Sequence, residues 1–471
     1  MSHTFHPSVI REYDMRGVYN ETLREADAFA LGRAFAQWVN GPVAVGRDGR
    51  VSSPSLQRAL IEGLRAGGVD VTDVGVGPTP MLYFAVKTLP GMKAGIMVTG
   101  SHNPPTHNGF KMMRIEGSVH GDQIVELAQR ATQLSPTATE TQGSLTTMSV
   151  TADYIQAMQD KAGDYLSQVD ASQTFVWDCG NGAAGAVVPQ LVAQLPGTHV
   201  VMYPELDGSF PHHHPDPTVE ENLIALKETV KQRKAAVGLA FDGDGDRLGI
   251  VDEHARFVPM DDLIALFAAD VLGLKQGATI IADVKCGPQL FAEISRLGGR
   301  PVMWRTGHSP IKAKMAESGA PFAGEYSGHL FFADRYYGFD DGVYAALRVL
   351  NILAREKKPL SQLLAHIPVR TGLPELRLEV ADDQKFFIVE RFKDLIQAHP
   401  HFPKDGKVIT IDGIRVETPD GWLLLRASNT QGALVLRVEG RSKDALEKLQ
   451  SLIKDVFDQL SLTDLAEKIA A

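Results

Sequence analysis

Apolar and polar residues are spaced along the first part of the chain as in strands that alternate with helices. Residues 23–38 are apolar at positions 23, 26, 30, 31, 34, 35 and 38, which is the spacing of one helix face. A short strand is predicted at 43–46, a second helix over 52–67 with a proline in its first turn, and another strand over 69–74. This order predicts a mainly parallel sheet covered by helices, followed by a polar linker at 137–149.

The pattern continues through two further units and then changes. Strands are predicted at 175–177 and 237–241 in the second unit, and at 279–282 and 301–304 in the third. The last hundred residues show short strands over 407–438, joined by hairpin turns and followed by an amphipathic helix at about 442–460.

A chain of 471 residues is too long for one core, and ~150 residues per domain suggests three or four domains. We therefore predict an α/β protein with three mixed α/β sheet domains and a C-terminal antiparallel α+β domain, arranged around a central cleft. The expected domains cover residues 1–150, 151–255, 256–368 and 369–471.

Composition removes several classes of partner. The 47 Lys and Arg against 57 Asp and Glu give a net charge of −10, which argues against a nucleic-acid surface. No apolar run approaches the ~20 residues of a membrane span, and the N-terminus does not resemble a secretory signal. Cys179 and Cys286 form no disulfide framework, and His212–His214, bracketed by prolines, are expected on a surface or inter-domain loop. We expect a cytoplasmic protein with no nucleic-acid or membrane partner.

The loop over 99–111 follows an apolar strand predicted at 94–98, so Ser101 lies just past a strand end. Open α/β sheets place reacting groups in the crevice beyond such ends. With His102 beside it and Lys111 beyond, Ser101 suits a nucleophile or a phosphate carrier. An ordinary polar turn has the same composition, so the residues alone leave both interpretations open.

Asp242, Asp244 and Asp246 alternate with glycines and can bend around one hard cation, for which oxygen ligands suit Mg²⁺ or Ca²⁺. A calcium-binding EF-hand needs glycine at its sixth position, where Arg247 stands, and a helix where a strand leads in. A solvated acidic turn is the remaining alternative. Arg247 favours the metal, because a cation beside the carboxylates suits a phosphorylated ligand.

Two later loops carry groups suited to a sugar phosphate. Glu325, Ser327 and His329 share one short loop and suit recognition of neighbouring sugar hydroxyls. The loop with Arg426, followed by hydroxyl and amide side chains, suits a phosphate dianion. Each loop is equally compatible with a generic turn when it is taken alone.

The four loops, in this order, resemble those of the α-D-phosphohexomutase superfamily, and most closely its bacterial phosphomannomutase/phosphoglucomutase branch. The resemblance covers essentially the whole chain. It implies reversible conversion of hexose 1-phosphate and hexose 6-phosphate through a phosphoserine and a hexose 1,6-bisphosphate, which is also the activator. One Mg²⁺ per chain, a phosphorylated hexose (mannose or glucose) as substrate, and a monomer or weak homodimer are expected.

The resemblance also implies roles for individual residues. The implied catalytic residues are Ser101, His102, Lys111, Arg247 and His329. The implied metal ligands are phosphorylated Ser101, Asp242, Asp244 and Asp246. The implied substrate-binding residues are Tyr13, Arg16, Lys285, His308, Glu325, Ser327, Arg426, Ser428, Asn429 and Thr430.

Two residues depart from the pattern of this branch, and other functions compete with the mutase reaction. Tyr326 stands where that branch usually has Met, and His107 where Tyr is common; both can shift sugar preference. The phosphoglucosamine mutase branch is disfavoured by Ser428-Asn429-Thr430. A hydrolase would be expected to show a Gly-x-Ser-x-Gly elbow, which Ser101 lacks. A metal-dependent sugar phosphatase is a less favoured alternative, and it would release inorganic phosphate. A non-catalytic phosphosugar-binding protein would lack at least one catalytic group, but this sequence has all of the expected groups.

Overall fold

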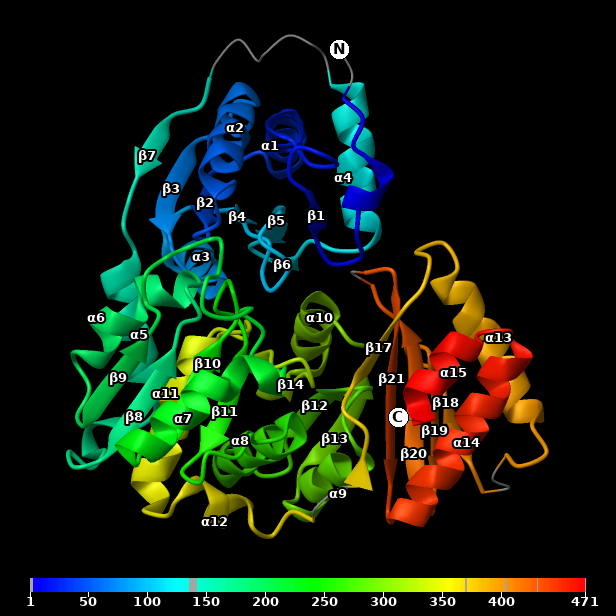
Figure 1. Ribbon diagram of the computed structural model, residues 1–471. Coiled ribbons are helices and arrows are strands. Elements are labelled where there is room, and N and C mark those ends of the chain that lie inside the picture. The colour runs from blue at the N-terminus through cyan, green and yellow to red at the C-terminus, as the bar shows by residue number, and fades with distance from the viewer. Residues whose placement is uncertain (1–2, 135–141, 369–370, 403–404, 430, 471) are drawn as a thin grey trace.

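The computed structural model describes residues 3–134, 142–368, 371–402, 405–429 and 431–470. In these ranges the chain forms four sheets, one after another along the sequence (Figure 1). The first three mix parallel and antiparallel strands and carry helices, whereas all strand pairs of the fourth are antiparallel. The predicted fold class is confirmed.

The first sheet has the order β1-β5-β4-β2-β3-β7, with β6 beside β5. Strands β2, β3, β4 and β7 are parallel, while β5 is antiparallel to β4 and β1. The elements are η1 (Pro7–Val9), β1 (Met15–Val18), α1 (Glu25–Val39), β2 (Val43–Arg47), α2 (Ser53–Ala66), β3 (Val71–Val76), α3 (Thr79–Thr88), β4 (Ala94–Val98), β5 (His107–Arg114), β6 (Gly117–Ser118), α4 (Asp122–Gln133) and β7 (Leu145–Thr147). The predicted helices and strands over 23–74 form because their apolar faces are buried, as Leu31 and Phe35 of α1 are.

Strand β7 lies in the segment predicted as a linker, 137–149. Leu145–Thr147 pairs in parallel with β3, although all three residues are exposed. An exposed edge strand of three residues has no buried face, so hydrophobic alternation does not reveal it. The segment therefore extends the first sheet as well as leading into the second domain; its residues 137–141 lie outside the described part of the chain.

The second and third sheets have the orders β11-β10-β8-β9 and β13-β12-β14-β15. The second domain contains α5 (Thr151–Ala162), η2 (Leu166–Gln168), β8 (Thr174–Asp178), η3 (Ala183–Ala186), α6 (Val188–Val192), β9 (Thr198–Met202), η4 (Glu220–Leu223), α7 (Ile224–Arg233), β10 (Val237–Phe241) and β11 (Leu248–Asp252). The third contains α8 (Met260–Leu274), β12 (Thr279–Asp283), α9 (Pro288–Arg296), β13 (Arg300–Trp304), α10 (His308–Ser318), β14 (Phe322–Gly324), β15 (Leu330–Phe332), α11 (Gly342–Glu356) and α12 (Leu360–Leu364).

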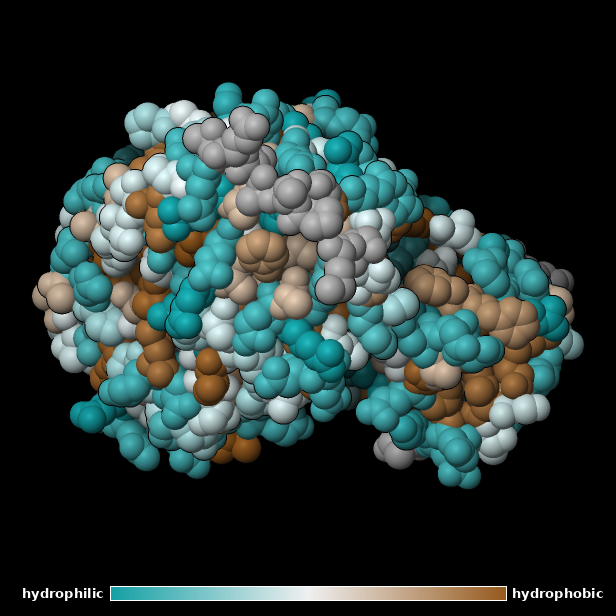
Figure 2. Space-filling view, turned by 90° about the horizontal axis from the view of Figure 1, so that it is seen from above, coloured by the Kyte–Doolittle hydropathy of each residue, from teal (hydrophilic) through white to brown (hydrophobic). Residues whose placement is uncertain are grey.

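The fourth domain is an antiparallel sheet of the order β16-β21-β20-β19-β18, with β17 also paired to β21. Its elements are β16 (Thr371–Gly372), β17 (Leu376–Glu379), α13 (Lys385–Ala398), β18 (Lys407–Ile409), β19 (Ile414–Thr418), β20 (Gly421–Ala427), β21 (Ala433–Gly440), α14 (Lys443–Gln459) and α15 (Thr463–Ala470). The strands and the helix predicted over 407–460 are confirmed. Figure 2 shows this domain as a separate, smaller lobe at the right.

The four loops singled out in the sequence share one structural setting: each joins the two strands of an antiparallel hairpin. The hairpins are β4–β5, β10–β11, β14–β15 and β20–β21. Each domain therefore contributes one tight polar loop, and these loops converge where the four domains meet. A cleft at that point is lined by residues of the first to fourth domains.

Candidate active site

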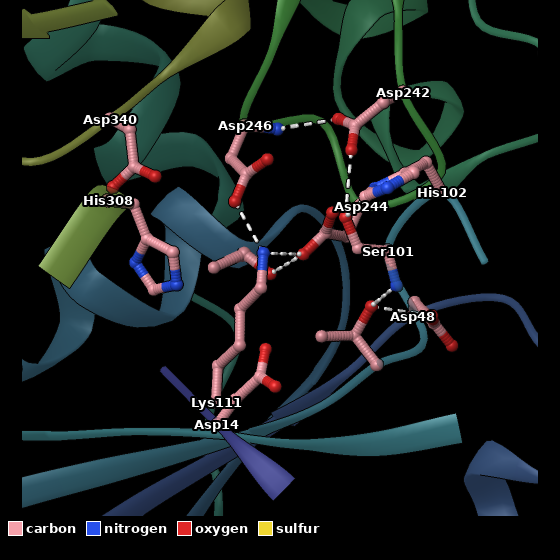
Figure 3. A network of polar contacts seen from close by, with 12 residues as sticks. Asp14, Asp48, Ser101, His102, Lys111, Asp242, Asp244, Asp246, His308 and Asp340 are labelled. Carbon is pink, nitrogen blue, oxygen red and sulfur yellow. Dashed lines mark hydrogen bonds and ion pairs between the residues drawn. The ribbon is translucent and has the colours of Figure 1, made fainter. Parts of the chain in front are cut away.

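Ser101 occupies the turn that follows β4. Its side chain is fully buried, and its backbone φ of 48° lies in the left-handed region, which Gly, Asn and Asp adopt more readily than serine. Its Oγ donates a hydrogen bond to Asp242 Oδ2 at 3.0 Å and lies 3.2 Å from Nδ1 of His102 (Figure 3). The hydroxyl of the first domain thus faces the carboxylate loop of the second.

The carboxylate loop is the tight turn of the β10–β11 hairpin. Asp242, Asp244 and Asp246 are fully buried, and one ligand oxygen from each lies within 4.8 Å of the others. Oδ1 of Asp242 accepts the backbone N–H of Asp246 at 3.1 Å, which holds the loop closed. Oδ1 of Asp244 and Oδ1 of Asp246 are buried without a hydrogen-bond partner among the described residues. Three converging carboxylates with such oxygens fit a hard divalent cation.

Lys111 lies between two of these carboxylates, with Nζ 2.7 Å from Asp244 Oδ2 and 2.5 Å from Asp246 Oδ2 (Figure 3). Burial, and after it the neighbouring carboxylates, raises the pKa of Asp242 well above its usual value. Burial acts in the same direction on Asp244, yet the Lys111 ammonium holds the pKa of Asp244 below its usual value. Burial opposes the charge of Lys111 too, but Asp244 and Asp246 raise the pKa of Lys111, which keeps it a cation.

Arg247 and His329 come from two different hairpin loops and meet above the carboxylates. Nε of Arg247 donates to Nε2 of His329 at 3.0 Å, and Nδ1 of His329 lies 2.9 Å from Asp340 Oδ2. His308 is a neighbouring ring, with its centroid 5.7 Å from that of His329. Burial lowers the pKa of His308 well below its usual value, so this ring is neutral at physiological pH.

The loop that carries Glu325, Ser327 and His329 is tied to neighbouring residues by short hydrogen bonds. Oε1 of Glu325 accepts the N–H of Gly307 at 2.5 Å, and burial raises the pKa of Glu325. Tyr13 O–H donates to Thr306 O at 2.5 Å and also bonds the side-chain amide of Asn429. The first, third and fourth domains thus share one set of hydrogen bonds at the cleft.

Cations line the remaining walls of the cleft, and each is matched by a carboxylate. Lys285 Nζ lies 3.0 Å from Glu375, and Nε of Arg426 lies 3.0 Å from Asp412. Tyr326, the residue that departs from the expected Met, lies against the guanidinium of Arg437 at 3.6 Å from the ring centroid. A partner of this kind fixes a planar guanidinium in place.

The structure brings nearly all of the predicted site residues together. Those that line the cleft are Tyr13, Arg16, His102, Lys111, Arg247, Lys285, His308, Glu325, Ser327, His329, Arg426, Ser428 and Asn429. Ser101 and the three aspartates adjoin this lining: Ser101 Oγ lies 3.2 Å from His102, Lys111 contacts Asp244 and Asp246, and Asp242 accepts the hydrogen bond of Ser101. Thr430 lies outside the described residues.

Several supporting residues were missed by sequence reasoning. Asp48 accepts hydrogen bonds from Thr99 Oγ1 at 2.8 Å and from Ser53 Oγ at 2.5 Å, and Arg50 bonds the loop of Ser101. A signal was present, because the polar stretch Asp48-Gly49-Arg50 directly follows β2, much as the loop of Ser101 follows β4. Asp340 has no such signal, since its contact with His329 exists only in the folded chain.

The glycine-rich turn and the histidine run have structural partners. Ala183 N–H donates to Gly243 O at 2.9 Å, so the glycine-rich turn after β8, residues 178–185, supports the carboxylate loop. His212 contacts Asn181 at 2.7 Å, whereas His213 contacts Asp178 at 3.0 Å. The two rings therefore have separate partners and do not converge on one ion. Across the described ranges, only two groups of side chains could hold a metal: the three aspartates, and Asp246 with His329 and Asp340.

Comparison with known proteins agrees with this geometry domain by domain. Family models described as phosphoglucomutase/phosphomannomutase match residues 8–136 (alpha/beta/alpha domain I), 152–255 (domain II), 259–370 (domain III) and 375–456 (C-terminal domain). The chain belongs to the phosphoglucomutase/phosphomannomutase family. The expected resemblance is thereby confirmed.

Members of the phosphoglucomutase/phosphomannomutase family match along almost the whole chain. A phosphomannomutase/phosphoglucomutase of Pseudomonas aeruginosa is 43% identical over 456 residues, covering 96% of each protein. A phosphoglucomutase of Neisseria gonorrhoeae is 40% identical, again with 96% of each covered. A crystal structure of a Burkholderia thailandensis family protein superposes with a TM-score of 0.87 at 41% identity, covering 97% of this chain and 98% of that one. Among the described residues, no helix has the length and apolar character needed to cross a membrane.

Proposed function

We propose that this protein reversibly converts hexose 1-phosphate and hexose 6-phosphate, with glucose, mannose or both as the sugar, through a phosphorylated Ser101 and a hexose 1,6-bisphosphate. The observation that carries the proposal is the hydrogen bond from Ser101 Oγ to Asp242, next to His102, which lines a cleft rich in cations. The relatives of the same family are named phosphomannomutase/phosphoglucomutase and phosphoglucomutase, and these activities support the same reaction.

Mg²⁺ is the proposed cofactor, one per chain. Asp242, Asp244 and Asp246 would hold it together with a phosphate oxygen on Ser101, because their carboxylate oxygens converge and Oδ1 of Asp244 and of Asp246 has no hydrogen-bond partner among the described residues. When bound, the ion would neutralise negative charge on the phosphoryl group and on the crowded carboxylates.

The side chains of this protein would carry the protons and the charge. The attacking sugar hydroxyl forms a new P–O bond as the P–O bond to Ser101 breaks. Its proton passes to His329, and the serine oxygen takes a proton from the Lys111 ammonium. Arg247, which contacts His329, stabilises the moving phosphoryl group, and the buried position of Ser101 excludes water from the phosphoserine.

The other groups would bind the part of the sugar phosphate that does not react. Arg426, Ser428, Asn429 and Thr430 form the proposed phosphate-binding loop, and Glu325 with Ser327 would recognise sugar hydroxyls. The bisphosphate must turn over between the two transfers, so one site has to accept both orientations. The same bisphosphate, added from solution, would act as the activator by phosphorylating Ser101.

The proposed setting is the cytoplasm, with a monomer or weak homodimer as the working unit. Residues of all four domains of a single chain line the cleft, so one chain supplies the complete site that the reaction needs. A phosphatase is the less favoured reaction, because Ser101 is shielded from water.

Phosphorus NMR tests the proposal. Incubation with glucose 1-phosphate or mannose 1-phosphate, Mg²⁺ and a trace of bisphosphate is expected to yield the 6-phosphate without inorganic phosphate. Ser101→Ala should abolish turnover and the mass increase of one phosphoryl group seen after bisphosphate treatment. Release of inorganic phosphate would indicate a phosphatase, turnover of glucosamine 6-phosphate alone a phosphoglucosamine mutase, and turnover by Ser101→Ala would disprove the phosphoserine route.

A further inference from the structure

The loop that carries Ser101 is held by one guanidinium that has no place in the proposed chemistry. Arg50 follows β2, and its side chain is 1% exposed. Its Nη2 donates to Ser101 O at 2.7 Å and to Asn103 O at 2.6 Å. Its Nη1 donates to Pro104 O at 2.7 Å and to His107 O at 2.9 Å. Four carbonyls of one loop therefore converge on a single planar side chain.

Asp48 holds Arg50 and the same loop from the other side. Its Oδ2 lies 3.3 Å from Nε of Arg50, and the same oxygen accepts the Thr99 hydroxyl at 2.8 Å and the Gly100 N–H at 3.2 Å. A carboxylate and a guanidinium thus satisfy both the N–H and the C=O groups of the turn. Buried backbone groups that are bonded in this way cannot rotate without losing several bonds at once.

Two glycines leave the space that the Arg50 guanidinium and the Ser101 carbonyl occupy. A Cβ on Gly100 would lie 2.6 Å from Cζ of Arg50, so only glycine leaves room for the side chain at that position. A Cβ on Gly243, in the carboxylate loop, would lie 2.3 Å from Ser101 O, the carbonyl that Arg50 binds. The Ser101 carbonyl is therefore fixed between Arg50 and the backbone of the metal-binding loop.

We propose that Arg50, oriented by Asp48, is the positioning residue that holds Ser101 in its left-handed conformation and so directs Ser101 Oγ toward Asp242. The φ of 48° is unfavourable for a serine and persists only where its surroundings impose it. Here the four hydrogen bonds from the Arg50 guanidinium to carbonyl oxygens impose this φ. A lysine at position 50 has neither the planar shape nor enough N–H donors to replace those four bonds. The inference rests on the proposed function of Ser101 as the phosphoryl carrier.

The Arg50→Lys variant distinguishes a role of Arg50 in positioning Ser101 from a role in binding the substrate. The kcat for glucose 1-phosphate is expected to fall about 100-fold, the cost of displacing a reacting group by about 1 Å, while KM stays near the wild-type value because Arg50 does not line the cleft. Phosphorylation of Ser101 by the bisphosphate, followed by intact mass, should slow in parallel. Amide hydrogen exchange in residues 99–108 should become faster while exchange in the carboxylate loop stays unchanged.

Arg348→Lys is the matched control, because Arg348 is equally buried but pairs with Asp270 and Asp334 in the third domain. It should lower the melting temperature as Arg50→Lys does, and leave kcat and loop exchange near wild type. Wild-type kcat or unchanged loop exchange in Arg50→Lys would overturn the inference, as would a loss of activity no greater than in the control. Inactive wild-type protein would instead refute the proposed function, and loop exchange would still decide the role of Arg50.

Discussion

At the scale of single residues, the least favourable feature of the protein is the crowding of three buried aspartates in one turn. Burial disfavours each charge, and the aspartates repel one another, which is why the pKa of Asp242 is raised. Lys111 pairs with Asp244 and Asp246, whereas Asp242 faces Nε of Arg247 at the longer distance of 3.9 Å. A bound cation would remove this repulsion, so metal binding and folding stability should be strongly linked.

Asp242→Asn should therefore have opposite effects with and without metal. The metal-free variant is expected to melt at a higher temperature than the metal-free wild type, because one buried like charge is removed. Saturating Mg²⁺ should stabilise the wild type by about 2.7 kcal/mol at 100 times Kd and the variant by much less. Thermal unfolding across a Mg²⁺ titration measures both effects.

Asp252→Asn is the matched control for this experiment. Asp252 is a buried carboxylate at the other end of the same hairpin, where it pairs with Arg256 at 2.7 Å. This variant should keep the full response to Mg²⁺ whatever its stability. An Asp242→Asn variant that responds to Mg²⁺ like the wild type would show that the metal binds elsewhere.

At the scale of elements, helix α11 begins at a carboxylate that is buried. Oδ1 of Asp341 accepts the N–H of Tyr344 at 2.9 Å and caps the helix. Its Oδ2 accepts the hydroxyls of Tyr154 at 2.8 Å and Tyr336 at 2.9 Å, which ties α5 to the third domain. Burial outweighs these hydrogen bonds and raises the pKa of Asp341 to about 7.

This raised pKa predicts a pH dependence of stability with a definite sign. Between the unfolded pKa of 3.8 and the folded pKa of about 7, the folded state binds the proton more tightly. The contribution of Asp341 to the free energy of unfolding should be complete below the lower value and fall by about 4 kcal/mol as the pH rises through the higher one. Urea unfolding of the wild type and of Asp341→Asn, which stays neutral, should show a difference that changes by that amount. A difference that is constant with pH would refute the prediction.

At the scale of the whole molecule, one core cluster runs through the first three domains, the first domain has a second cluster of its own, and the core of the fourth domain is separate. One apolar cluster contains Leu82, Trp177 and Phe322, which come from the first, second and third domains. The core of the fourth domain is confined to residues 378–469, and a small cluster of Val284, Trp422 and Leu424 joins it to the third. A domain attached in this way is expected to move relative to the others.

We therefore expect the fourth domain to close over bound substrate. Glucose 1-phosphate should lower the radius of gyration of the wild type in small-angle X-ray scattering, because the phosphate draws the Arg426 loop toward the cleft. Arg426→Lys, which cannot form the same bidentate contact, should show a weaker decrease at equal substrate concentration. An unchanged radius of gyration at saturating substrate would contradict the closure.

A contact could be predicted from the sequence only where the two interacting residues lie close together along the chain. The turn from Asp242 to Arg247 was predicted together with its metal chemistry, because all of its residues lie within one hairpin. The resemblance placed Lys111 among the catalytic residues, but its contact with Asp244 spans 133 residues and could not be predicted from the sequence. The edge strand at 145–147 was missed because its residues have no buried face.

The sequence by itself determined the main alternation of strands and helices and the positions of the four polar loops, because these depend on spacing within a few residues. Only the tertiary structure decided that Arg50 holds the Ser101 loop and that Asp340 contacts His329. The physical reason is that hydrogen bonds and ion pairs between distant segments form once the hydrophobic cores have brought those segments together. No local pattern in the sequence predicts which buried hydrogen-bond donor will contact which acceptor.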